Sequence, residues 1–143
     1  GRCRGPRDAG ADRFRSQHDE ILAIATEISS HFAKVDISKD ANTIRLLLSK
    51  LAGKVTMHLA MEDNSLYPRL FNSEDPSVRA TSKKFATEMS QIKDVFGMFV
   101  KTWSQPTAIE KESQKFIQET KNLFVALKSR IDHENTKLYP MIS

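Results

Sequence analysis

The chain has one cysteine and no long hydrophobic run. Cys3 has no second cysteine to pair with, so an internal disulfide is excluded and nothing indicates an oxidising compartment. No apolar stretch approaches the roughly 18 residues that a membrane-spanning helix needs, and no signal-peptide core is present. These absences predict a cytoplasmic protein without a membrane partner.

The sequence also lacks a concentrated basic patch. Its net charge is +4 and its pI is about 9.3, but lysine and arginine alternate with acidic residues, as in KESQKF and KSRIDHENTK. No basic block carries interleaved aromatic residues for stacking on bases. We therefore expect a mixed, solvated surface and no nucleic-acid partner.

The first twelve residues, GRCRGPRDAGAD, contain no large apolar residue and do not begin with Met. We expect residues 1–12 to be a flexible leader or linker, derived either from a vector or from a longer protein. Residues 13–143 then form one domain, which is long enough to bury a single substantial core.

From Arg13 onward, apolar residues recur at helical spacing in four segments, and no strand alternation persists. Short connections make consecutive helices antiparallel neighbours, so the sequence predicts an all-α, up-down-up-down four-helix bundle. Asp36, Ser38, Asp40 and Asn42 are candidate caps for the second helix. The four stripes are Phe14, His18, Ile21, Ala25, Ile28 and Phe32; Ile44, Leu48, Leu51, Val55, His58, Glu62 and Leu66; Phe85, Met89, Ile92, Phe96 and Phe99; and Ile109, Phe116, Thr120, Leu123, Leu127, Arg130 or Ile131, Glu134 and Leu138.

Four polar residues lie on these apolar stripes: His18, His58, Glu62 and Glu134. A buried imidazole or carboxylate costs several kcal/mol unless something pairs with it, and a metal ion is one such partner. His58 and Glu62 are four residues apart, so they share one helix face and can reach the same centre. Taken alone, H-x-x-x-E is a common chance pattern, and a lone core histidine is more often a hydrogen-bonded structural residue.

Three phrases together resemble a known family: HDEIL at 18–22, HLAMEDNSLYP at 58–68 and DHENTKLYP at 132–140. They are similar to the hemerythrin-like HHE cation-binding domains, and the resemblance covers Phe14 to Met141. It implies a non-haem di-iron centre inside an antiparallel four-helix bundle. Members of that family bind or sense O2 and NO, handle iron, or act as domains of signalling proteins.

The resemblance is incomplete at three positions. Met89 stands where the third helix should supply histidine, and a thioether is a poor ligand for hard iron ions. Alignment of the two Leu-Tyr-Pro endings puts Glu134 opposite Glu62 and Arg130 opposite His58. A guanidinium has no lone pair to donate. His133 is then either a flank residue or, with the last turn rebuilt, a replacement ligand.

Two functions follow from this comparison. The first is a sensory or binding domain for a diatomic molecule such as O2 or NO, or for iron itself. It would hold one or two non-haem ions through His18, His58 and Glu62, with Glu134 or His133 closing the site; a single Fe or Zn is conceivable. The second is a metal-free regulatory or protein-interaction module, attached to a signalling protein or binding a protein partner.

In the second function, Arg130 would neutralise Glu62 and Glu134 in a buried network. Alternatively, its long stem would carry the charged head out to solvent. No nucleophile–base pair or phosphate loop suggests an enzyme. Tyr67 and Tyr139, each before a proline, are interpreted as marking helix ends, although a buried phenol near the site could also hydrogen-bond a bound ligand.

Overall fold

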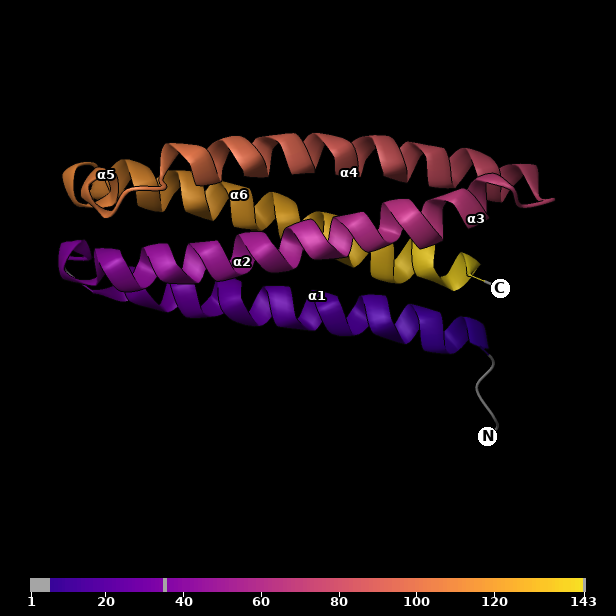
Figure 1. Ribbon diagram of the computed structural model, residues 1–143, viewed down its shortest axis with the longest axis horizontal. Helices are drawn as coiled ribbons and strands as arrows, with labels where there is room; N and C mark the ends of the chain where they lie inside the picture. The colour runs from indigo at the N-terminus through magenta and orange to yellow at the C-terminus, as the bar shows by residue number, and fades with distance from the viewer. Residues whose placement is uncertain (1–5, 35, 143) are drawn as a thin grey trace.

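The computed structural model describes residues 6–34 and 36–142, with side chains from residue 11 onward. Its four long helices lie side by side and alternate in direction (Figure 1). They are α1 (Pro6–Ser30), α2 (Ala41–Met61), α4 (Pro76–Thr102) and α6 (Ser113–His133). The prediction of an all-α bundle is confirmed, and the described residues contain no β-strand.

The first helix begins earlier than the sequence indicates. α1 starts at Pro6, so the boundary expected between residues 12 and 13 lies inside a helix. Proline suits a first helical turn because its missing N–H would have no helical partner there. Ala11 is buried in the smaller apolar cluster, so the helix packs against the bundle before residue 13. Residues 1–5 of the expected leader lie outside the described residues.

Shorter helical elements connect or extend the long helices. In chain order they are the 3₁₀ turns His31–Ala33 and Ser38–Asp40, the π-helical turn Glu62–Leu66, α3 (Tyr67–Phe71), α5 (Pro106–Lys111), the π-helical turn Glu134–Leu138 and the 3₁₀ turn Tyr139–Met141.

A side-chain cap forms at the start of α4 but not at the predicted position at the start of α2. At α4, Asp75 Oδ1 accepts from the Ser77 backbone N–H at 2.8 Å. At α2, Asp40 occupies the cap position without making a side-chain cap bond. Its carboxylate lies instead 2.7 Å from His31 Nδ1 and 2.6 Å from Lys34 Nζ. Asp40 therefore ties the end of α1 to the start of α2.

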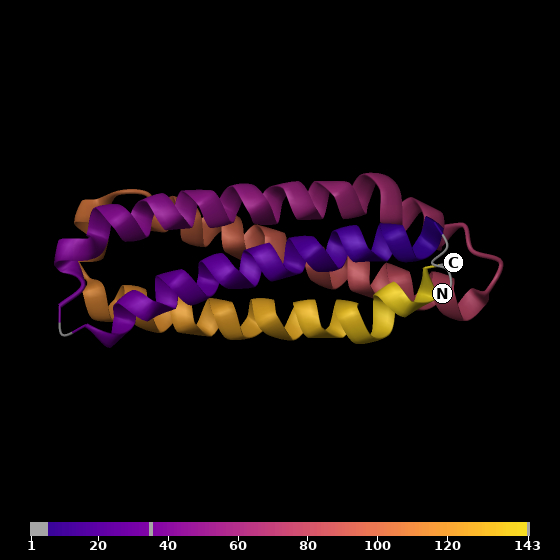
Figure 2. The same ribbon diagram turned by 90° about the horizontal axis from the view of Figure 1, so that it is seen from below.

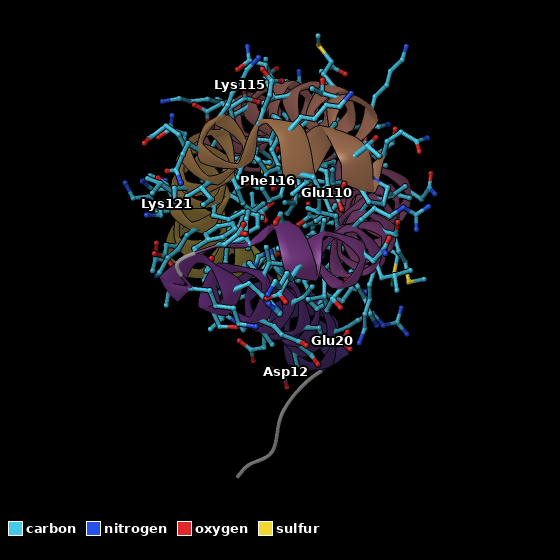
Figure 3. The ribbon with its side chains drawn as sticks, turned by 90° about the vertical axis from the view of Figure 1, so that its left-hand side faces the viewer. Asp12, Glu20, Glu110, Lys115, Phe116 and Lys121 are labelled. Atoms are coloured by element: carbon cyan, nitrogen blue, oxygen red, sulfur yellow. The ribbon has the colours of Figure 1, made fainter. Side chains whose placement is uncertain are left out.

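Each long helix packs against two others. α1 lies between α2 and α6 (Figure 2), and α4 also contacts both α2 and α6. In the end-on view, Phe116 lies among the helices while Lys115, Lys121 and Glu20 extend outward (Figure 3). This is the arrangement expected of amphipathic helices around one apolar interior.

The interior contains two apolar clusters, one near each end of the bundle. The larger includes Ile28, Ile44 and Trp103, and the smaller includes Phe14, Leu66 and Tyr139. Along α1 and α2, His18 and His58 come between residues of the two clusters. Within the described part of the chain, no helix combines the length and hydropathy needed to cross a membrane.

Candidate metal centre

The structure brings four of the five predicted ligands into one buried group. His18 comes from α1, His58 from α2, and Glu62 and Glu134 each begin a π-helical turn. All four are between 0 and 2% exposed. One nitrogen or oxygen atom from each lies within 4.8 Å of the others, so the four can contact a single ion.

The two imidazoles face each other at the centre of this group. His18 Nε2 lies 2.9 Å from His58 Nε2 and 2.9 Å from Glu134 Oε1. His58 Nε2 lies 3.2 Å from Glu62 Oε2 and 3.7 Å from Glu134 Oε1. Donors bound at about 2.1 Å to one ion at right angles would be about 3 Å apart. These separations are therefore those of atoms that can share one coordination sphere.

Both glutamates owe their position to the same backbone feature. The Tyr67 N–H donates to Glu62 O, and the Tyr139 N–H donates to Glu134 O, each five residues back. The residue that follows each tyrosine is a proline, which has no N–H with which to continue an ordinary helical ladder. Such π-helical turns occur often at functional sites. The repeated Leu-Tyr-Pro phrase therefore encodes a local widening of the helix at each candidate carboxylate ligand.

Amide side chains hold the outer nitrogens of both histidines. His18 Nδ1 lies 2.9 Å from Asn135 Oδ1, and His58 Nδ1 lies 2.7 Å from Gln17 Oε1. Gln17 Nε2 donates to Met61 Sδ at 3.0 Å, which leaves Gln17 Oε1 as the acceptor for the imidazole N–H. A neutral histidine that donates from Nδ1 presents the lone pair of Nε2. When Nε2 carries no proton, both lone pairs point into the group, as metal-binding histidines require. When Nε2 is protonated, it donates to the neighbouring carboxylates instead.

Two tyrosines complete the group, and each donates a hydrogen bond to the glutamate of the other repeated segment. Tyr139 OH donates to Glu62 Oε2 at 2.7 Å and lies 3.0 Å from His18 Nε2. Tyr67 OH donates to Glu134 Oε2 at 3.2 Å. Both phenols are buried next to the group, and their hydrogen bonds to the two glutamates are a contact that the sequence did not predict. Their repeated place after each candidate glutamate was the signal that could have identified them.

The ionisable groups divide into protonated and ionised partners. Burial opposes the charged form of His58, but hydrogen bonds to Glu134 and Glu62 outweigh it and raise its pKa to about 9. Burial, together with the charge of Glu134, raises the pKa of Glu62 to about 8. Burial also acts on Glu134, but hydrogen bonds from His18 and His58 hold its pKa at about 2. Two carboxylates this close ionise together only when extra positive charge is present.

An unpaired carboxylate oxygen in the group also favours a bound divalent cation. Glu62 Oε1 is buried and has no hydrogen-bond partner among the described residues. A buried carboxylate oxygen without a partner costs free energy that a bound cation would recover. Two imidazoles and two carboxylates also form a hard to intermediate donor set that suits iron or zinc.

Three positions discussed from the sequence lie outside the group. Met89 is 4% exposed and packs in the larger apolar cluster. Arg130 Nη2 lies 2.8 Å from Glu88 Oε1, so Arg130 does not form the buried network with Glu62 and Glu134. The alternative, in which its side chain turns away from the group, agrees better with the structure. His133 lies outside the group. Together with Lys84 and Arg130, it lines a separate cavity.

Arg130 turns away because α4 offers it partners that the candidate centre does not. Its guanidinium carbon lies 5.3 Å from the centre of the Phe85 ring, and Glu88 supplies the opposite charge. The donor group draws on α1, α2 and the two π-helical turns, and within the described chain no α4 residue joins it. Of the four long helices, α4 therefore supplies no donor to the candidate site among the described residues.

One comparison with known proteins gives a match. The family model described as "Hemerythrin HHE cation binding domain" matches residues 9–142 of the chain. No curated protein and no solved structure gives a significant match. The matched range includes all four residues of the buried group and both tyrosines.

Proposed function

Because the chain belongs to the hemerythrin HHE cation-binding domain family, we propose that it binds one non-haem metal ion, preferentially iron, at His18, His58, Glu62 and Glu134. The observation that carries the proposal is the pair of Nε2 atoms 2.9 Å apart. With both Nδ1 atoms committed to amide oxygens, two lone pairs meet there, and they repel unless a proton or a cation lies between them.

A single ion accounts for the donors better than two. Four side-chain donors can hold one ion, whereas two ions would need ligands from positions that Met89 and Arg130 occupy. Met89 packs in the apolar core, and Arg130 pairs with Glu88. Neither residue supplies the imidazole that a second ion would require.

We further propose that the domain serves as a sensory or binding module rather than as an enzyme. A bound iron would supply a redox-active centre with coordination positions left for a small molecule such as O2 or NO. The four donor residues are at most 2% exposed, which favours a ligand of diatomic size. Tyr139 lies against His18 and Glu62, where its phenol can orient such a ligand by hydrogen bonding.

Metal analysis of protein purified from iron-supplemented cells, together with an absorption spectrum, tests this proposal. We expect about one iron per chain, and a stability that falls when a strong chelator removes it. The variant H58A should lose the ion, whereas H31A, which changes a histidine of the Asp40 contact, should keep it. Protein that takes up no metal and is unaffected by chelator would overturn the proposal.

The second candidate is a metal-free interaction module, and the internal hydrogen bonding of the group favours it. Tyr139, Tyr67 and His18 already bond to both carboxylates, so the described residues satisfy much of the buried charge themselves. Metal analysis separates the two candidates directly. The module would show no metal under iron, zinc or manganese supplementation.

A further inference from the structure

We propose that the cavity between α4 and the end of α6 binds a phosphate-type oxyanion. The cavity has a volume of about 310 Å³ and is lined by Thr81, Lys84 and Glu88 of α4 and by Arg130, His133 and Lys137. It contains none of the four candidate metal ligands. Its occupation therefore does not depend on the metal function proposed above.

The charge of the lining residues favours an anion. Lys84, Arg130 and Lys137 are cations, and Glu88 is the one acid that lines the cavity. Glu88 is already committed to Arg130 at 2.8 Å, although it lies four residues from Lys84 on the same helix. The two lysines form no ion pair with any described residue. A dianion such as a phosphate ester would neutralise them.

Arg130 is held in place before any ligand arrives. Its side chain is 18% exposed, pairs with Glu88, and lies over the Phe85 ring at 5.3 Å. A guanidinium fixed in this way loses little conformational entropy when an anion binds. Its Nε is buried and has no hydrogen-bond partner in the described structure. The held guanidinium thus keeps one donor uncommitted.

His133 and Thr81 add further hydrogen-bond donors to the lining of the cavity. His133 Nδ1 is buried without a hydrogen-bond partner among the described residues, and it can donate in the tautomer that carries the proton there. The Thr81 hydroxyl also lines the cavity. Unpaired buried polar atoms are uncommon in folded proteins. Two such nitrogens therefore lie in residues that line one cationic cavity.

These donors suit a phosphate group better than a carboxylate or an extended polyanion. They converge from two helices and include ammonium, guanidinium, imidazole and hydroxyl groups, which match an oxyanion with several acceptor oxygens. The volume is that of a small-molecule site. A nucleic acid would instead need a continuous basic surface, and the sequence has none.

Titration of the purified full chain with inorganic phosphate, at constant ionic strength and fixed metal content, tests the proposal. Calorimetry gives the affinity, and the side-chain Nε–H resonance of Arg130 reports contact in the NMR spectrum. We expect saturable binding with a shift of that resonance, and binding of acetate at least about tenfold weaker. Parallel titration with glycerol phosphate distinguishes the free ion from an ester, and binding of either supports the site.

The matched variants are K84Q/K137Q and K93Q/K115Q. Each pair removes one lysine from α4 and one from α6 or the turn after it, and all four side chains are exposed. We expect the cavity pair to weaken phosphate binding by about tenfold or more and the distant pair to change it by less than about twofold. Equal losses in both pairs, no saturable binding to the wild type, or an unmoved Arg130 resonance would each overturn the proposal.

Discussion

Tyr139 donates a hydrogen bond to Glu62 across the bundle, at 2.7 Å and 77 residues away in the sequence. Its counterpart Tyr67 donates to Glu134 at 3.2 Å. Each repeated phrase therefore supplies a candidate metal ligand and the phenol that holds the other phrase's ligand. The two tyrosines differ because Tyr139 makes the shorter bond and also lies 3.0 Å from His18 Nε2 and 3.4 Å from Glu134 Oε1.

This asymmetry predicts different costs for two matched substitutions. Y139F should lower the free energy of unfolding by roughly 1–3 kcal/mol, because Glu62 and His18 both lose a buried partner. Y67F should cost less, since only the longer bond to Glu134 is lost. Urea unfolding of the metal-free proteins measures both. Equal costs would contradict the expectation that the additional contacts of Tyr139 stabilise the fold.

The metal-free domain should become less stable as the pH rises from about 6.5 to 9. The pKa of His58 is raised from 6.5 to about 9, and that of Glu62 from 4.5 to about 8. The folded state therefore binds more protons than the unfolded state over these ranges, and the stabilisation present at lower pH is lost as the pH passes through the folded values. Glu134 has the opposite sign, and its contribution is lost only as the pH falls towards 2.

Denaturant unfolding at a series of pH values checks this slope. The variant E62Q, which mimics the neutral carboxyl, should flatten the part of the slope that Glu62 causes. A bound divalent ion replaces the same protons, so the metal-loaded domain should show a weaker decline. A metal-free domain whose stability is constant from pH 6.5 to 9 would contradict the assignment of protons to His58 and Glu62.

Loss of an outer hydrogen bond should weaken metal binding without removing a ligand. N135A leaves His18 in place but frees its Nδ1 from Asn135 Oδ1. Metal affinity should fall by about 10- to 100-fold, as is typical when a histidine ligand loses its partner. Competition with a chromophoric chelator measures the change. N122A on α6, where Asn122 is exposed and accepts only from Gln118, is the matched control.

Placing histidine at positions 89 and 130, where the family resemblance leads one to expect it, tests why the site would hold a single ion. R130H alone should leave the content at about one ion per chain, because α4 would still supply no donor. The double variant M89H/R130H should raise it towards two, since both positions would then carry imidazoles. Metal analysis gives the stoichiometry. A second ion in R130H alone would show that Met89 is not the obstacle.

The helices were predictable because burial imposes a simple period. Stripes such as Ile44, Leu48 and Leu51 identify a helix and its buried face without reference to its neighbours. The same stripes placed His18, His58, Glu62 and Glu134 inside, and the structure agrees. The start of α1 was less predictable, since the small residue Ala11 gives little apolar signal.

The tyrosines and Arg130 were not predictable from a regular helix. Five residues advance an α-helix by about 140° beyond a full turn, which would turn Tyr139 away from the face of Glu134. The π-helical turn removes much of that offset and brings the phenol inside. The direction of Arg130 depended on Glu88 and Phe85 of another helix. Spacing along one helix contains no information about such partners.

The contact between His18 and Glu134 joins residues 116 positions apart, on the first and the last long elements of the bundle. An ion held by both would act as a removable cross-link between the N-terminal and C-terminal parts of the chain, and His58 would include α2 in the same cross-link. α4 would stay outside it, fastened by apolar packing and the Arg130–Glu88 pair. Metal supply would then change the stability of the contacts among α1, α2 and the end of α6 more than that of the contacts made by α4.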